Sequence, residues 1–138
     1  MSLSADEIVR MMSDVDVLKS MRAHMERENR VAEARLVEKL GNIRNFQQMQ
    51  RMMVRRACPN MPDTDIVLHE QHVRQLEEEL ALVQEAWRQE RTVIDAAIDK
   101  FRASPTMDTY PTFIELGEKL DRIKVETERR SAAIRAAR

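Results

Sequence analysis

Apolar residues recur every seven positions along most of this chain, in three stretches separated by prolines. In the first stretch one heptad series begins at Ile8 and a second at Met11, and both continue to about residue 57. Residues spaced by seven share one side of an α-helix, so this pattern predicts long helices that bury a narrow seam. No proline interrupts the stretch before Pro59, and we therefore expect a first helix over residues 5–57.

The second stretch carries the most regular heptad of the chain. Apolar residues at every seventh position run from Ile66 to Phe101 and predict a helix over residues 64–103. The six residues 58–63 between the first two helices include two prolines and form a predicted loop. A connection this short predicts that the two helices are antiparallel neighbours.

A third, shorter helix is predicted over residues 112–136, after a linker at 104–111 that also contains two prolines. Thr112 precedes Glu115 by three residues, which is the spacing of a capping box at a helix start. The sequence thus predicts a single elongated all-α domain over residues 1–138. Its architecture is a long antiparallel coiled-coil hairpin with a shorter third helix, which makes an unequal three-helix bundle.

The predicted hairpin has a definite register, in which residues whose numbers sum to about 121 face each other. This register places Asp99 near Arg22, and Glu90 near Asn29 and Arg30. Because the first helix is the longest, it leaves two apolar surfaces uncovered, and uncovered apolar strips of this kind mark interaction sites. The alternative is that the third helix docks on the amino-terminal overhang, so that the monomer closes on itself. The predicted surface at the amino-terminal end comprises Ile8, Met11, Met12, Val15 and Leu18. The predicted surface at the hairpin tip comprises Phe46, Met49, Met53, Ile66 and Val73, with the basic residues Arg51, Arg55 and Arg56.

Charge and composition narrow the function classes. Charged residues make up 34% of the 138 residues, yet the net charge is −1, which argues against nucleic acid as a partner. No apolar run is long enough for a transmembrane segment, and Cys58 is the only cysteine, which fits a reducing compartment. We expect a cytoplasmic protein, with a cytoskeleton-associated location as one possibility.

Residues 46–56, Phe-Gln-Gln-Met-Gln-Arg-Met-Met-Val-Arg-Arg, resemble the IQ motif that binds calmodulin and related light chains. The apolar–Gln pair and the two basic residues have the spacing of that motif, with Met52 in place of its usual glycine. The resemblance implies a calmodulin-like light chain as an alternative partner. A membrane-binding helical module is a further alternative, which the net charge of −1 disfavours.

The sequence offers no constellation for catalysis, for a cofactor or for a metal. His69 and His72 are three residues apart, which is not the spacing of the two-histidine zinc motif, and no general acid and base can be paired. The leading expectation is a non-enzymatic structural or scaffolding coiled-coil subunit. Its predicted partner is a second copy of itself, as a homo-oligomer, or another helical protein.

Overall fold

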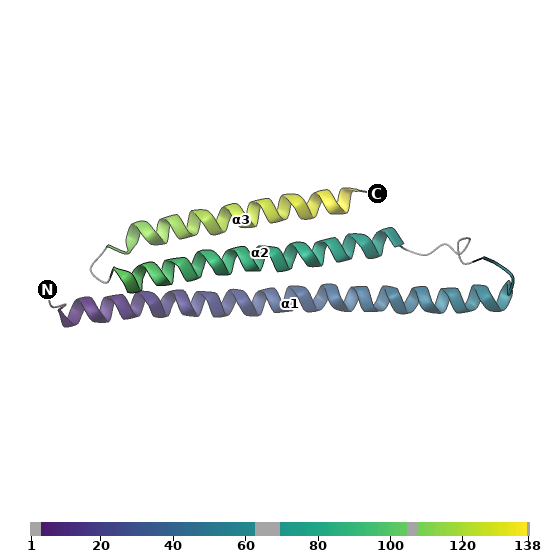
Figure 1. Ribbon diagram of the computed structural model, residues 1–138, viewed down its shortest axis with the longest axis horizontal. Helices are drawn as coiled ribbons and strands as arrows, with labels where there is room; N and C mark the ends of the chain where they lie inside the picture. Colours follow the sequence, from purple (N-terminus) through teal and green to yellow (C-terminus); the bar gives the residue numbers. More distant parts are fainter. Residues whose placement is uncertain (1–3, 63–69, 105–107, 138) are drawn as a thin grey trace.

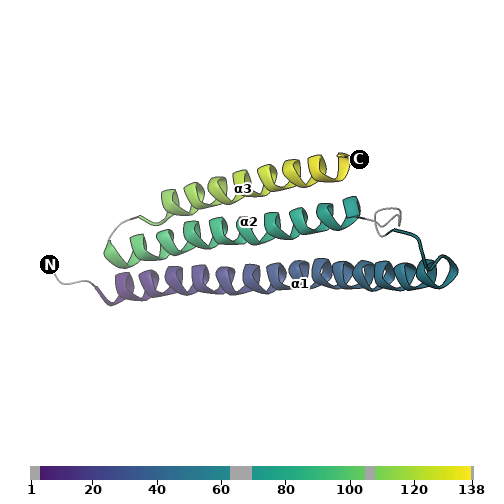
Figure 2. The same cartoon turned by 45° about the vertical axis from the view of Figure 1, so that its right-hand side comes forward.

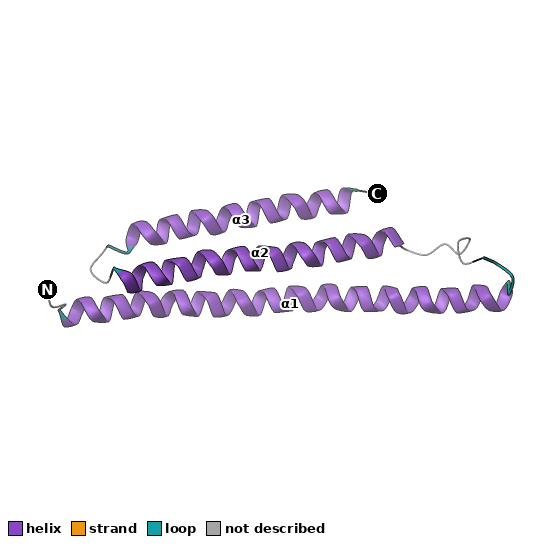
Figure 3. Cartoon of the chain, viewed as in Figure 1, coloured by secondary structure: helices purple, strands orange, loops and turns teal. Residues whose placement is uncertain are grey.

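The residues that the structure describes form three α-helices and no strand (Figure 1 and Figure 3). The computed structural model describes residues 4–62, 70–104 and 108–137, without the side chains of residues 7–13. The helices are α1 (Ala5–Ala57), α2 (Glu70–Ala103) and α3 (Tyr110–Ala136). The predicted all-α fold class is confirmed.

The prolines fix the ends of the helices much as the sequence predicts. Both ends of α1 and the end of α2 agree with the predicted ranges, whereas the predicted start of the second helix falls in residues 63–69, outside the described residues. At the end of α1 the amide of Cys58 donates to the carbonyl of Val54 at 2.7 Å. Pro59 has no amide hydrogen to continue this series. The chain then turns, with the amide of Met61 donating to the carbonyl of Cys58 at 3.1 Å.

The start of α3 differs from the prediction. The helix begins at Tyr110, whose amide donates to a carboxylate oxygen of Asp108 at 3.1 Å. Thr112 therefore lies inside the first turn and is buried, and Glu115 pairs with Lys119 at 2.8 Å. The predicted capping box of Thr112 and Glu115 is wrong. The helix starts two residues before Thr112, at Tyr110, whose amide donates to the Asp108 side chain.

Helix α2 lies in the middle of the molecule, with α1 and α3 on separate sides of it (Figure 1 and Figure 2). All three helices are antiparallel to their neighbours in the chain. Among the described residues no Cα atom of α3 comes within 8 Å of a Cα atom of α1, so the bundle is open rather than closed. Helix α3 therefore covers a side of α2 and leaves most of the surface of α1 uncovered.

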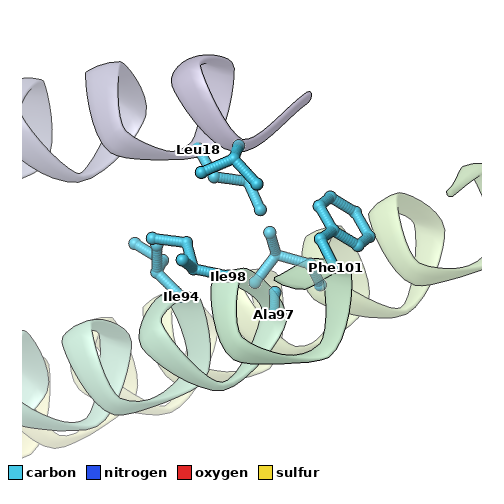
Figure 4. Close-up of a cluster of buried hydrophobic side chains, with 7 residues drawn as sticks. Leu18, Ile94, Ala97, Ile98 and Phe101 are labelled. Carbon is cyan, nitrogen blue, oxygen red and sulfur yellow. The ribbon is translucent and has the colours of Figure 1, made fainter. Parts of the chain in front are cut away.

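The largest apolar cluster lies where the end of α2 meets the first part of α1 and of α3 (Figure 4). Leu18 of α1 points at Ile98 and Phe101 of α2, and Phe101 meets the ring of Phe113 of α3 edge-on, at 5.3 Å between centroids. Leu18, Ile94 and Phe101 are the most completely buried large side chains described. Burying a side chain of this size contributes about 1.5–3 kcal/mol, so this cluster anchors all three helices. Its buried members are Val15, Leu18, Ile94, Ala97, Ile98, Phe101 and Leu116.

The register between α1 and α2 is close to the predicted one but not identical. Arg44 pairs with Glu77 at 2.7 Å, and these numbers sum to 121 as predicted. At the other end Arg22 pairs with Asp95 and not with Asp99, which is exposed. Both pairs fit one intermediate register, because an arginine side chain reaches a partner most of a turn away along the helix.

The second prediction places Glu90 near Asn29 and Arg30, but among the described residues Glu90 forms no ion pair with Arg30. Arg30 pairs with Glu26 on its own helix at 3.0 Å. Glu90 instead lies partly buried near Glu28, and burial first and the Glu28 carboxylate second raise the pKa of Glu90. An exposed carboxylate of α1 thus lies close enough to oppose the ionisation of Glu90 on α2.

Candidate interaction surface on helix α1

Six large apolar side chains are exposed along the side of α1 that faces away from α2. On an ideal helix they fall within about 120° of one another, and roughly opposite them lie the buried residues Val15, Leu18 and Leu40. Each of the six is between 51% and 68% exposed. We call them the outer stripe of α1: Val17, Val31, Phe46, Met49, Met52 and Met53.

The predicted amino-terminal surface is largely contradicted for the residues that can be examined. Ile8, Met11 and Met12 lie in α1, but their side chains are outside the described set. Val15 and Leu18 are 8% and 0% exposed and belong to the central cluster. The prediction failed because, at this end, the last turn of α2 reaches closer to the amino terminus of α1 than it does in the predicted register, where facing residue numbers sum to 121. It therefore covers Val15 and Leu18. Neither residue is available to a partner.

The members of the predicted hairpin-tip surface that lie on α1 are exposed, except for the half-buried Arg55. Val73 of α2 is half-buried, and Ile66 lies outside the described residues. Phe46, Met49 and Met53 are 53%, 61% and 68% exposed. Heptad numbering places Phe46 and Met53 in the seam, yet the buried apolar residue in this half of α1 is Leu40. A straight α-helix drifts by about 20° in each heptad relative to a strict seven-residue repeat. Over the four heptads from Leu18 to Phe46, the heptad series that begins at Met11 therefore rotates by about 80°, out of the seam and onto the surface.

The sequence reasoning missed Val17 and Val31 and named Met52 only within the IQ-like segment, and all three belong to the outer stripe. They are 14 and 21 residues apart and so share one position of a second heptad register, away from the seam. That spacing was present in the sequence, but the residues between them at the same register are His24, Glu38 and Asn45. Only the exposure of the three apolar residues separates this side of the helix from an ordinary polar surface.

The carboxyl-terminal third of α1 is strongly basic. Residues 39–57 contain five basic side chains and no acidic one. Arg44 reaches across to Glu77, and all the others except the half-buried Arg55 are exposed. The basic residues are Lys39, Arg44, Arg51, Arg55 and Arg56. An apolar strip flanked by arginines suits a partner surface that is apolar with an acidic rim.

Two open grooves accompany α2 on its exposed side. One, of about 370 Å³, lies between α1 and α2 beside Val37 and Gly41; the other, of about 420 Å³, lies between α2 and α3 beside Glu85 and Arg130. Ala81 lines both grooves. Glu85 of α2 and Arg130 of α3 form an ion pair at 3.6 Å across the second groove, so these two charges already have partners within the chain. The outer stripe remains the larger apolar surface.

No group of three or more His, Cys, Asp or Glu side chains in the described part of the chain could hold a metal ion. None of the described helices is long and apolar enough to cross a membrane. Comparisons with protein-family models, with curated proteins and with solved structures find no match to this chain. Its function is therefore argued from the surface itself.

Proposed function

We propose that this protein is a non-enzymatic structural or scaffolding coiled-coil subunit that assembles through the outer stripe of α1. It would do so with itself or within a larger helical or cytoskeletal complex in the cytoplasm. The observation that carries the proposal is that α1 is covered by α2 on one side, while its other side carries six exposed large apolar side chains.

The physical argument rests on solvent exposure. Moving an exposed valine, methionine or phenylalanine side chain out of water contributes about 1.5–3 kcal/mol, and a half-exposed one contributes roughly half as much. Several such residues on one line of a rigid helix supply a free-energy gain to any helix that covers them. Assembly along the outer stripe would follow the predicted mechanism, in which the interface buries apolar residues and arginine–carboxylate pairs fix the register.

Light scattering coupled to size-exclusion chromatography, over a tenfold concentration range, tests assembly with itself. We expect a mass of at least twice 16.2 kDa for the natural chain. The double variant Val17→Asp with Val31→Asp should return to the monomer mass, because it places two charges on the outer stripe where the partner would bury them. Val125→Asp is the matched control, since Val125 is 56% exposed but lies on α3.

A monomer at every concentration would rule out assembly with itself and would leave docking on a larger complex as the function. An oligomer that survives the double variant would show that another surface holds it together.

A light-chain target is the second candidate, and one observation favours it. Phe46, Met49 and Met53, at i, i+3 and i+7, are each more than half exposed, so this face of the IQ-like segment is accessible to solvent. Titration of the chain with calmodulin, with and without calcium, tests this candidate. Binding that Phe46→Asp abolishes would support it, and absence of binding in both conditions would reject it.

A further inference from the structure

We infer that the outer stripe of α1 is covered by α1 of a second copy of this chain, running in the opposite direction. This inference rests on the proposed function and specifies the partner and its orientation. It follows from two properties of α1: its charge is unequally divided between its ends, and its exposed apolar residues extend over much of its length.

The two ends of α1 carry opposite net charge. Residues 5–18 contain Asp6, Glu7, Asp14 and Asp16 against one basic residue, Arg10. Residues 39–57 contain basic residues and no acidic residue. Two parallel copies would place like-charged ends together, whereas two antiparallel copies place each basic end beside an acidic end. The helix dipoles add to this preference, since the positive amino terminus then lies beside the negative carboxyl terminus of its neighbour.

The outer stripe also has a natural centre for a two-fold axis. Val31 is the middle residue of Ala5–Ala57 and is 51% exposed. With Val31 on the axis, residues whose numbers sum to 62 face each other across the two copies. Arg56 then lies opposite Asp6, and both side chains are exposed in the single chain. Val17 lies opposite Asn45, beside Phe46.

The area available is sufficient for a specific dimer. A helix of 53 residues is about 80 Å long and presents a strip about 10 Å wide. This corresponds to roughly 800 Å² from each copy, which is the area that specific protein–protein interfaces of standard size bury. Since α3 does not approach α1 among the described residues, nothing described there stands in the way of the second copy.

Disulfide trapping in a Cys58→Ser background tests the orientation. In an antiparallel dimer Val31→Cys should form a disulfide with itself on mild oxidation, because the residue lies on the axis. Val17→Cys should not link to itself, but a mixture of Val17→Cys and Asn45→Cys chains should form linked dimers. The natural Cys58 should also fail to link, because the two copies of this exposed residue lie about 80 Å apart.

Charge reversal gives an independent readout that needs no disulfide. Arg56→Glu should raise the dissociation constant of the dimer about fivefold, because two equivalent pairs are lost. The swapped variant, Asp6→Arg with Arg56→Asp, should restore it. In a parallel dimer the same single reversal would relieve repulsion and tighten the dimer. Raising the salt concentration should weaken the natural dimer and not the Arg56→Glu variant.

The outcomes separate this inference from the proposed function. Self-linked Val17→Cys or Cys58, together with a tighter Arg56→Glu dimer, would overturn the antiparallel arrangement and leave assembly intact. A monomer in light scattering would overturn the second copy as the occupant, and the outer stripe would then belong to a different protein.

Discussion

At the scale of single side chains, charge holds the α1–α2 seam together at some positions and opposes it at one. Arg22 and Arg44 each bond a carboxylate of α2, whereas Glu90 of α2 lies within electrostatic reach of the exposed Glu28 carboxylate of α1. Burial, and then the neighbouring carboxylate, raise the pKa of Glu90 above its ordinary value. Because the folded chain binds the proton more tightly than the unfolded chain, stability is lost as pH rises from the ordinary carboxyl pKa through the raised one.

Glu90→Gln should remove this loss. We expect the variant to be more stable than the natural chain at neutral pH, by on the order of 0.5 kcal/mol, the size of a like-charge contact between partly exposed side chains. The difference should vanish at about pH 3, where Glu90 is protonated in both states. Thermal unfolding of both proteins between about pH 3 and neutral pH measures this difference in stability. His24, which lies 3.0 Å from Glu28, is unchanged in the variant, so its contribution to stability cancels in the comparison. Glu128→Gln, at an exposed position, is the control, and a Glu90→Gln variant that is less stable at neutral pH would contradict the interpretation.

At the scale of helices, local signals in the sequence predict where elements begin and end, and packing decides the rest. Pro59 ends α1 because it lacks an amide hydrogen, which can be seen in the sequence. The exposure of Phe46 could not be predicted from heptad numbering alone, because the drift of a straight helix depends on how tightly its partner supercoils with it. The local sign of this drift is at residues 39 and 40. The heptad series that begins at Met11 reaches the polar Lys39, whereas the buried apolar residue is its neighbour Leu40. The docking side of α3 left no comparable sign in the sequence.

Helix α3 should be the first element to separate from the molecule. It packs on α2 alone among the described helices, through the buried Leu116, the contact of Phe113 with Phe101, and an ion pair at 2.6 Å between Arg135 and Glu79. Leu116→Ala should cost about 2–5 kcal/mol, the usual range for a buried leucine. Hydrogen exchange should then accelerate over α3 and much less over α1. Val125→Ala, on the exposed side of α3, should leave both unchanged. Equal acceleration over all three helices would instead indicate one cooperative unit.

The whole molecule is a rod with a thin apolar core, and its length is set by α1. A compact chain of 138 residues has a radius of gyration of about 14 Å, whereas a rod about 80 Å long has one of about 23 Å. A rod buries few residues completely, since its interior is only two or three side chains across. This geometry explains why so many large apolar residues remain exposed along α1 and why covering them with another helix is favourable.

The length of the rod also distinguishes the ways in which two copies can associate. Antiparallel copies joined along the outer stripe should double the mass while the longest dimension stays at about 80 Å. Copies joined end to end through the basic hairpin tips would instead approach about 160 Å, and they would bring together two segments that contain no acidic residue to offset their charge. Small-angle X-ray scattering with the mass measured on the same sample separates the two. We expect a doubled mass at nearly constant length, and a doubled length would show that the apolar tip overcomes its own repulsion.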